Sequence, residues 1–349
     1  MIKLLIVEDS PVARDFLNFI FDSDPTIEII GIAKDGMEAI DLVGKLMPDV
    51  ITMDIHMPGM DGFETTRRIM ETNPTPIVIV SASEGIKEIA STFRAMEAGA
   101  LAVIHRPPGV NSDLFKKSSE ELIRTVKLMS EVKVVRRTQK LTMNKINIPK
   151  ESPPRGREGI KVIAIGASTG GPMALQKILS ALDKSLPIPL LIVQHITAGF
   201  VHGFVEWLSK SCSIPLSVAN DKEQLLPGHG YIAPDNIHMG IGNESRIELS
   251  DHAHENSVKP SIGYLFRTVA EVYGANSIGV LLTGMGRDGA DELKVMRNKG
   301  AITMAQDEKS SIVYGMPNEA VKLNAAIHVL PPEGIANLIN AFIEKMKEK

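Results

Sequence analysis

Residues 161–172 read KVIAIGASTGGP, and this stretch decides how the C-terminal half of the chain is interpreted. An apolar run typical of a buried strand ends at Ala167, and Ser168 follows it. The glycines Gly170 and Gly171 come next, before a proline, and are typical of a turn into a helix. The pattern predicts a hydroxyl at the carboxyl end of a strand, against a helix N-terminus. Such a serine becomes a nucleophile only with a base and an orienting acid.

Composition sets limits on the rest of the chain. Its 349 residues exceed the usual size of a single core, so we expect two domains. The net charge of −4 gives no reason to expect a nucleic-acid partner or an anionic membrane surface. Cys212 is the only cysteine, which excludes an intramolecular disulfide and fits a reducing compartment. The apolar stretch in MIKLLIVEDS is too short for a signal peptide or a membrane span, so we expect a cytoplasmic protein without membrane insertion.

The first 130 residues alternate short apolar runs with amphipathic segments. The runs KLLIV, IEIIGIA, DVITM, PIVIV and ALAVI are typical of strands buried on both faces. The amphipathic segments predict helices around 11–22, 36–46, 62–72, 87–97 and 112–130. Five strand–helix units predict an α/β domain with a doubly wound, flavodoxin-like parallel sheet.

The second half resumes this alternation. Strands are predicted at IKVIAIG, PLLIVQ, LSVA, SIGVLLT and AITMA, and helices near 171–182, 199–209, 260–273, 286–297 and 333–346. We expect a second doubly wound parallel sheet, Rossmann-like, with a β-hairpin insertion at residues 225–249 that contains His229 and His238.

The segment 131–158 separates the two alternating halves. It is rich in basic residues and prolines and lacks a sustained apolar period, which indicates a linker. The predicted organisation is a first domain at residues 1–125, a linker at 126–158 and a second domain at 159–349.

Three acidic residues follow strands of the first domain. Glu8 and Asp9 come after the first strand, and Asp54 comes after the third. Ligands bind outside the carboxyl ends of open parallel sheets, so these carboxylates should converge. Mg²⁺ takes such oxygen ligands, and it would neutralise charge during phosphoryl transfer to Asp54.

Two further residues fit a phosphate-accepting site. Ser81 ends the fourth strand, where its hydroxyl could donate to a phosphoryl oxygen, and Arg106 ends the fifth, where it could supply a cation. The alternative is that the acids at these strand ends are ordinary helix N-caps.

In the second domain, Ser168, His195 and Asp288 each follow an apolar strand. We interpret them as nucleophile, general base and orienting acid of a hydrolase. Backbone N–H groups at Thr169–Gly170, or in the turn around Met285, could bind the oxyanion.

Each of these residues has a plainer interpretation. GASTGG could be a phosphate-binding glycine loop, although it lacks the Walker lysine and the GxGxxG spacing. His195 could lie at a helix start, and Asp288 could be an N-cap. His252 and His254 are spaced like metal ligands, but no further ligand is evident, and a polar loop is favoured.

Residues 1–125 resemble response-regulator receiver domains through LLIVEDS, ITMDIHMPGMDG, PIVIVSAS and HRPPG. The resemblance implies that Asp54 accepts a phosphoryl group from a histidine kinase, that Glu8, Asp9 and Asp54 hold Mg²⁺, and that Ser81 is the switch hydroxyl. Receivers usually carry lysine at the position of Arg106. Arginine keeps the charge but changes its reach and geometry.

Residues 159–346 resemble the catalytic domain of the chemotaxis protein-glutamate methylesterases through IGASTGGP, LLPGHGYIAP, LLTGMGRDGADEL and AQDEKSSIVYGMP. A receiver, a linker and this domain, in this order, form the full architecture of that family. The resemblance implies that Ser168, His195 and Asp288 are the triad. It also implies that the Met285 N–H helps form the oxyanion hole and that Thr169 supports the histidine.

The resemblance further implies a function in chemotaxis adaptation. The substrates would be glutamate γ-methyl esters of chemoreceptors, hydrolysed to glutamate and methanol, and receptor glutamines would be deamidated. The hydrolase step would need no cofactor. We hypothesise that the unphosphorylated receiver covers the groove near Ser168 and that phosphorylation of Asp54 weakens this cover. The alternatives are a deamidase of another protein and a non-catalytic docking module controlled by a receiver.

Overall fold

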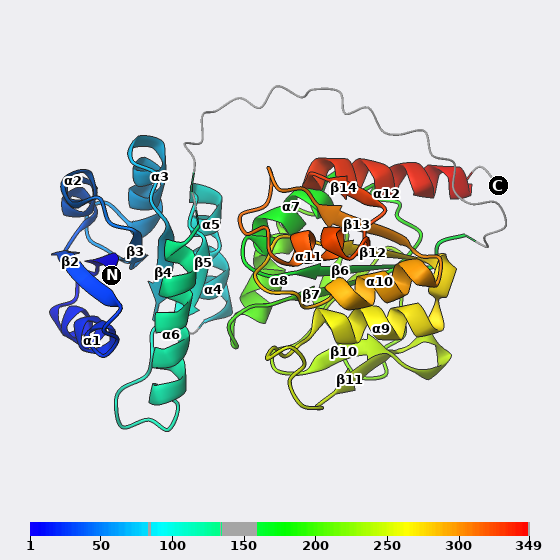
Figure 1. Cartoon of the computed structure of the whole chain (residues 1–349), viewed down its shortest axis with the longest axis horizontal. Helices are drawn as coiled ribbons and strands as arrows, with labels where there is room; N and C mark the ends of the chain where they lie inside the picture. Colours follow the sequence, from blue (N-terminus) through cyan, green and yellow to red (C-terminus); the bar gives the residue numbers. More distant parts are fainter. Residues whose placement is uncertain (83–84, 133, 135–158, 348–349) are drawn as a thin grey trace. The chain divides into compact units, whose positions relative to one another are not determined.

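This computed structural model of the chain describes residues 1–82, 85–132, 134 and 159–347. The chain separates into two compact units, Met1–Thr142 and Met143–Lys349 (Figure 1). Within the described residues, no helix combines the length and apolar character that a membrane crossing requires.

The N-terminal domain contains a five-stranded sheet in the order β2-β1-β3-β4-β5, in which every pair of neighbours is parallel. Its strands are β1 (Ile2–Val7), β2 (Ile27–Ala33), β3 (Val50–Met53), β4 (Ile77–Ser81) and β5 (Ala102–His105). They are the five apolar runs of the sequence. The central strands β3 and β4 are buried throughout, and β1 is buried from Leu4 to Val7. The predicted doubly wound α/β domain is confirmed.

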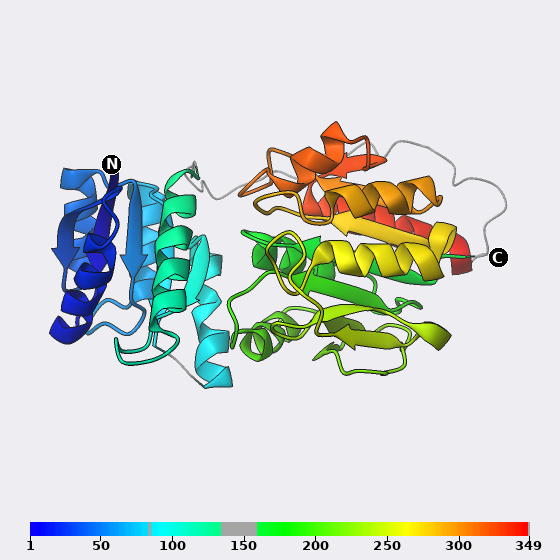
Figure 2. The ribbon, with the colours of Figure 1, turned by 60° about the horizontal axis from the view of Figure 1, so that its bottom comes forward.

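Helices lie on both faces of this sheet (Figure 2). They are α1 (Pro11–Asp22), α2 (Gly36–Leu46), α3 (Gly62–Thr72), α4 (Ile86–Thr92), α5 (Arg94–Ala98) and α6 (Phe115–Ser130). The N-cap side chains of Ser10, Asp35 and Asp61 accept hydrogen bonds from the first turns of α1, α2 and α3. The helix expected at 87–97 is divided in two at Phe93, a core residue that is 2% exposed.

The end of the N-terminal domain lies further along the chain than the proposed boundary at residue 125. Helix α6 continues to Ser130, so residues 126–130 are helical and not part of a tether. Of the proposed linker, residues 133 and 135–158 lie outside the described part of the chain.

The C-terminal domain contains a seven-stranded sheet in the order β14-β13-β12-β6-β7-β9-β8, again parallel at every pair. The strands are β6 (Val162–Ala167), β7 (Leu190–Gln194), β8 (Leu216–Val218), β9 (Gly230–Ile232), β12 (Ser277–Leu281), β13 (Ile302–Gln306) and β14 (His328–Leu330). The predicted Rossmann-like sheet is confirmed. Of the remaining strands, β9 lay within the range expected for the hairpin, and β14 was not predicted, because its three residues are not buried and form no apolar run of the kind typical of an inner strand.

Two groups of helices cover this sheet. One group, in which α12 and α8 both contact α7, comprises α7 (Gly171–Ala181), α8 (Val201–Ser209) and α12 (Pro332–Lys347). The other group comprises α9 (Ile262–Val272), α10 (Ala290–Asn298) and α11 (Met316–Lys322), with α10 in contact with both α9 and α11. Two short 3₁₀ turns are η1 (Asn243–Ser245) and η2 (Gly274–Asn276).

The β-hairpin is smaller than expected. It consists of β10 (His238–Ile241) and β11 (Ile247–Ser250), which pair antiparallel as a separate sheet beside α9 (Figure 1). The expected range began at residue 225, but β9 within it joins the main parallel sheet. His229 therefore precedes a strand of the main sheet, and only His238 belongs to the hairpin.

Each sheet has one switch point, where two neighbouring strands are followed by connections that run toward opposite edges of the sheet. In the N-terminal domain the neighbouring strands are β1 and β3. The connection after β1 leads to β2 on one side, and the connection after β3 leads to β4 on the other side. In the C-terminal domain the same holds for β6 and β12. Ligand sites of doubly wound sheets lie at the carboxyl ends of such neighbouring strands.

Candidate functional site

Ser168 lies at the switch point of the C-terminal sheet, directly after β6. Its N–H donates to Thr283 O at 3.1 Å, which ties the serine to the segment after β12. The turn into α7 requires glycines, because Gly170 has φ +77° and a Cβ on Gly171 would lie 2.2 Å from Gln194 Oε1. Ser168 is partly buried, so its hydroxyl lies at an accessible edge of the sheet.

Gln194 joins the serine and histidine segments. Its buried side chain ends β7, and Nε2 donates to Ser168 O at 2.9 Å and to His195 O at 2.7 Å. The pairing of β6 with β7 aligns Ala167 with Gln194, so Ser168 and His195 come next on adjacent strands. The amide therefore holds the backbones of the two predicted catalytic residues in register.

His195 and Asp288 are in direct contact. His195 Nε2 lies 3.0 Å from Asp288 Oδ2. An ionised carboxylate only accepts hydrogen bonds, so Nε2 carries the proton and Nδ1 is the free nitrogen of the neutral ring. Among the hydrogen bonds of the described residues, none joins Ser168 Oγ to the His195 ring. The structure thus pairs the proposed base with the proposed acid and places the serine on the adjacent strand end.

Asp288 is 3% exposed and lies at the N-terminus of α9. Besides His195, its carboxylate accepts hydrogen bonds from the Asn256 amide, the Ser261 hydroxyl and the N–H groups of Ile262 and Gly263. Burial alone raises the pKa of Asp288, but the hydrogen bond and charge of His195 and the α9 donors lower it, and the net pKa is below the usual 3.8. The carboxylate is therefore held in its ionised form.

The plainer interpretations of Asp288 and His195 are wrong. The N-cap of α10 is Gly289, without a side-chain cap, and Asp288 bonds to α9 instead. Helix α8 begins at Val201, six residues after His195, so the histidine is not at a helix start.

The residues expected around the oxyanion lie close to Ser168. A Cβ on Gly284 would be 2.6 Å from Ser168 Cβ, so the turn that contains Met285 packs against the serine. Within the described chain, the N–H groups of Thr169, Gly170 and Met285 have no hydrogen-bond acceptor, so they can donate to a ligand. The Thr169 carbonyl accepts from Thr283 Oγ1 at 2.9 Å, whereas the Thr169 hydroxyl makes no hydrogen bond to His195 among these residues.

The three acids of the N-terminal domain converge as expected. Each of Glu8, Asp9 and Asp54 offers a carboxylate oxygen, and these oxygens lie within 4.8 Å of one another. Glu8 and Asp54 are 1% and 6% exposed. They are not helix caps, because Ser10 caps α1 and Asp61 caps α3.

This acidic cluster has fewer hydrogen-bond donors around its carboxylates than Asp288 has. Burial, and then the charge of Asp54, raise the pKa of Glu8 to about 7. Burial also raises the pKa of Asp54. Glu8 Oε2 is buried without a hydrogen-bond partner. A hard divalent cation fits this oxygen-only site, because it would satisfy that oxygen and relieve the repulsion.

Ser81 and Arg106 lie beside the acids. Ser81 is 1% exposed at the end of β4, and its carbonyl accepts from the Arg106 N–H at 2.8 Å. The guanidinium of Arg106 faces Glu8, with Nη2 at 3.5 Å from Oε2, and its charge lowers the pKa of both Glu8 and Asp54. The expected cation is therefore close to the cluster and pairs with Glu8.

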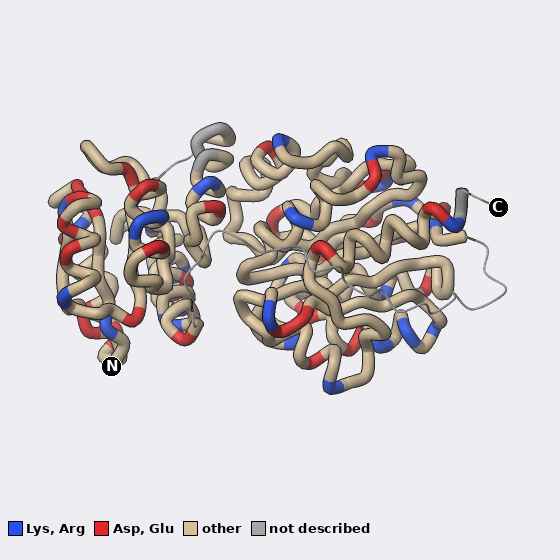
Figure 3. The backbone as a smooth tube through the Cα atoms, turned by 90° about the horizontal axis from the view of Figure 1, so that it is seen from above, with Lys and Arg blue, Asp and Glu red and all other residues tan. Residues whose placement is uncertain are grey.

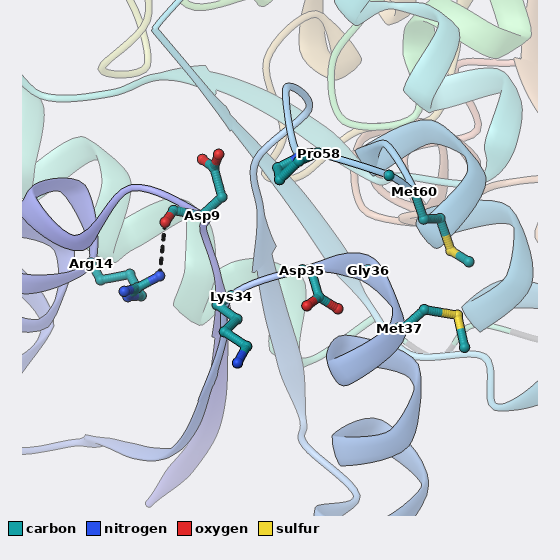
Figure 4. Close-up of a pocket in the computed structure, with 9 residues that line it drawn as sticks. Asp9, Arg14, Lys34, Asp35, Gly36, Met37, Pro58 and Met60 are labelled. Carbon is teal, nitrogen blue, oxygen red and sulfur yellow. Dashed lines mark hydrogen bonds between the residues drawn. The ribbon is translucent and has the colours of Figure 1, made fainter.

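An open pocket of about 530 Å³ adjoins the cluster at Asp9 (Figure 4). Its other lining residues are Arg14, Lys34, Asp35, Gly36, Met37, Pro58, Gly59 and Met60. Arg14 Nη1 donates to Asp9 O at 2.9 Å, which steadies the loop after β1. Elsewhere, acidic and basic residues are interspersed along the helices of both domains (Figure 3), often as pairs one turn apart such as Asp41–Lys45.

Some of these residues gave no signal in the sequence analysis. Gln194 was interpreted only as the end of a strand, and Ser261 only as part of a helix segment. His252 and His254 are exposed, and the one group of three that could hold a metal among the described residues is Glu8, Asp9 and Asp54.

Two family matches cover most of the described chain. Residues 163–339 match the family described as CheB methylesterase, and residues 4–116 match the response regulator receiver domain. The solved CheB methylesterase catalytic domain of Thermotoga maritima is 32% identical, with a TM-score of 0.51, covering 54% of this chain and 100% of that one.

Full-length relatives agree with these matches. A protein-glutamate methylesterase/protein-glutamine glutaminase of Syntrophus aciditrophicus is 52% identical over 342 residues, which is 97% of each chain. One from Nitrosospira multiformis is 50% identical over 350 residues, covering 100% of this chain and 99% of the relative. With the receiver match preceding the methylesterase match, the chain belongs to the CheB methylesterase family.

Proposed function

We propose that this chain hydrolyses glutamate γ-methyl esters on chemoreceptors, deamidates receptor glutamines, and is regulated by phosphorylation of its receiver domain. The names of the full-length relatives support the two reactions. The observation that carries the site assignment is the bond from His195 Nε2 to Asp288 Oδ2, at the same sheet edge where Ser168 ends β6. The reaction is a carboxylic ester hydrolysis in the cytoplasm, and the chain acts as a serine hydrolase.

Acylation begins with Ser168 Oγ attacking the ester carbonyl carbon. Because Nε2 is bound to Asp288, Nδ1 of His195 is the nitrogen that takes the serine proton. The carbonyl oxygen becomes an oxyanion, which accepts hydrogen bonds from the N–H groups of Met285 and Thr169–Gly170. Collapse of the intermediate expels methoxide, which takes the proton from His195 and leaves as methanol.

Deacylation uses the same groups. Water gives a proton to His195 and its hydroxide adds to the acyl carbon, and collapse then returns the proton to Ser168 and releases glutamate. A glutamine amide passes through a similar intermediate, and the nitrogen leaves as ammonia. Asp288 holds the imidazole ring and stabilises the positive charge that it gains in each half of the reaction.

In the receiver, Asp54 accepts the phosphoryl group, and the phosphodonor is a histidine kinase. Glu8, Asp9 and Asp54 would hold Mg²⁺, which when bound neutralises charge on the phosphoryl oxygens. The Ser81 hydroxyl donates to a phosphoryl oxygen, and Arg106 contributes a positive charge. Phosphorylation then shifts the receiver between two states and thereby raises the rate of the hydrolase.

Methanol release from membranes that contain methylated chemoreceptor tests this function. We expect wild type to release methanol and acetyl phosphate with Mg²⁺ to increase the rate. Ser168→Ala should abolish release, and Asp54→Asn should keep the basal rate but lose the increase. Release by Ser168→Ala would contradict the nucleophile, and equal stimulation of Asp54→Asn would contradict the phosphorylation site.

The rival functions give other results in the same assay. No methanol from wild type, together with ammonia release from a different protein, would indicate a deamidase of another substrate. Binding to receptors without any turnover would indicate a docking module.

A further inference from the structure

His238 is a buried histidine whose two ring nitrogens are both engaged. It begins β10 of the hairpin and is 0% exposed. Its Nε2 lies 3.0 Å from Ala253 O, and its Nδ1 accepts the Ser261 N–H at 3.1 Å. A carbonyl only accepts and an amide N–H only donates, so the ring is neutral with its proton on Nε2.

Ser261 connects this ring to the catalytic carboxylate. It is also 0% exposed, and its Oγ lies 2.8 Å from Asp288 Oδ1. The same oxygen accepts the N–H of Tyr264 at 3.2 Å, as the N-cap of α9. Because the ionised carboxylate only accepts hydrogen bonds, the Ser261 hydroxyl donates its proton to Asp288.

The hydrogen bonds form one continuous chain from the hairpin to the catalytic site. It runs from Ala253 through His238, Ser261 and Asp288 to His195. The His238 ring also stacks on Tyr264, with centroids 5.0 Å apart and planes at 26°. The first turn of α9, which supplies most of the donors to Asp288, is thus anchored from the side of β10.

We propose that His238 is a positioning residue for the hydrolase, which orients the Asp288 carboxylate through Ser261. This inference rests on the proposed function, in which Asp288 orients His195. His238 contacts neither the substrate nor His195, so its effect is on the geometry of the acid. Small displacements of such a group reduce the rate of the chemical step more than they reduce substrate binding.

Two substitutions separate this role from simple core packing. In His238→Asn, Oδ1 is as many bonds from Cβ as Nδ1 and can accept the Ser261 N–H. In His238→Gln, the amide is as far from Cβ as Nε2, so it can reach Ala253 O but leaves the Ser261 N–H without an acceptor. Both variants lose the aromatic stack, so they differ mainly in the link to Asp288.

A matched control is available in the same domain. His229 is also bonded to a serine, with Nε2 2.8 Å from Ser217 Oγ, and also packs on a tyrosine, Tyr231, at 4.6 Å. Among the described residues, no hydrogen bond connects His229 or Ser217 to Asp288. His229→Gln should therefore leave the kinetics unchanged.

The experiment measures kcat and KM for methanol release from a soluble methylated receptor fragment, with the full chain, acetyl phosphate and Mg²⁺, per folded molecule. We expect His238→Gln to lower kcat on the order of 100-fold at constant KM, and His238→Asn to restore most of it. Ser261→Ala, which removes the hydroxyl link without altering the ring, should lower kcat in the same way. This variant keeps the test decisive if His238→Gln does not fold.

Equal kcat for the Asn and Gln variants, or wild-type kcat for Ser261→Ala, would overturn the positioning role. Failure of the proposed function gives a different pattern, since wild type would then release no methanol, or Ser168→Ala and Asp288→Asn would release methanol like wild type.

Discussion

Asp288 in the C-terminal domain and Glu8 in the N-terminal domain are both buried acids at the switch point of a parallel sheet. Their pKa values nevertheless move in opposite directions. Five donors surround Asp288, and its pKa lies below 3.8 despite burial. Glu8 faces Asp54, and its Oε2 accepts no hydrogen bond although the Arg106 guanidinium lies 3.5 Å away, so its pKa still rises to about 7.

These opposite pKa shifts indicate that the same edge of a parallel sheet can serve two kinds of site. Asp288, the proposed catalytic acid, is kept ionised by the protein itself, through a helix N-terminus and a histidine, so it needs no external partner. The acids of the receiver are kept close together with few donors, and this arrangement fits the proposed Mg²⁺ site. A preorganised catalytic group and an open binding site thus arise from one fold.

The consequences for stability have opposite signs. A lowered pKa contributes stability that is present above the unfolded value of 3.8 and is lost as pH falls through the folded value. A raised pKa means that the native state binds the extra proton. For Glu8, stability is therefore highest below pH 4.5, declines up to about pH 7, and is constant above it.

Among the substitutions that test this comparison, Asp288→Asn has the largest expected effect. The amide cannot accept from His195 and from all the α9 donors, so the imidazole loses its orientation and its charge stabilisation. We expect kcat for methanol release to fall about 10,000-fold, as for triads in general. Phosphorylation of Asp54, measured with acetyl phosphate, should be unchanged. Wild-type kcat in this variant would remove Asp288 from the catalytic site.

A smaller effect is expected from Glu8→Gln without Mg²⁺. The rise in pKa from 4.5 to about 7 corresponds to about 3 kcal/mol of unfolding free energy above pH 7. The substitution should recover up to this amount at neutral pH and abolish the decline between pH 4.5 and 7. Denaturant unfolding of both proteins across this range checks it. Glu28→Gln, an exposed site on β2, is the control. If the unfolding free energies of wild type and Glu8→Gln depended on pH in the same way, the buried charge of Glu8 would be stabilised by its surroundings, as that of Asp288 is.

The smallest expected effect comes from Gln194→Met, which keeps the side-chain length but removes the two bonds to Ser168 O and His195 O. Ser168 O keeps the Gly171 N–H as a donor at 2.8 Å, so the serine turn should persist. We expect kcat to fall roughly tenfold with KM unchanged, because alignment of nucleophile and base loosens. The exposed Gln224→Met is the control. A change in KM alone would show that Gln194 acts on substrate binding instead.

Much of the fold could be predicted from local patterns. Ten long apolar runs became ten strands of two parallel sheets, and residues directly after them, such as Ser168 and Asp54, came to the expected edge. The family resemblance was confirmed by the comparisons. The triad, the oxyanion donors and the Mg²⁺ ligands stay predictions, although the structure brings His195 to Asp288 and gathers the three acids.

Other features had no local signal. The segment around β9 has the same pattern of short apolar runs between Gly and Asn turns as the hairpin. For this reason His229 was wrongly assigned to the hairpin. The link from Ser261 to Asp288 spans 27 residues and depends on how α9 packs against the loop after β12. No periodicity within either segment predicts such a contact.

The sequence by itself determined where most of the strands and turns lie, because burial on both faces and tight turns impose requirements on neighbouring residues. Only the tertiary structure decided which strands are neighbours and therefore which side chains meet. Strand order and helix docking depend on contacts between distant residues. For this reason the two acidic sites look alike in the sequence, whereas in the folded chain Asp288 is surrounded by donors and Glu8 is not.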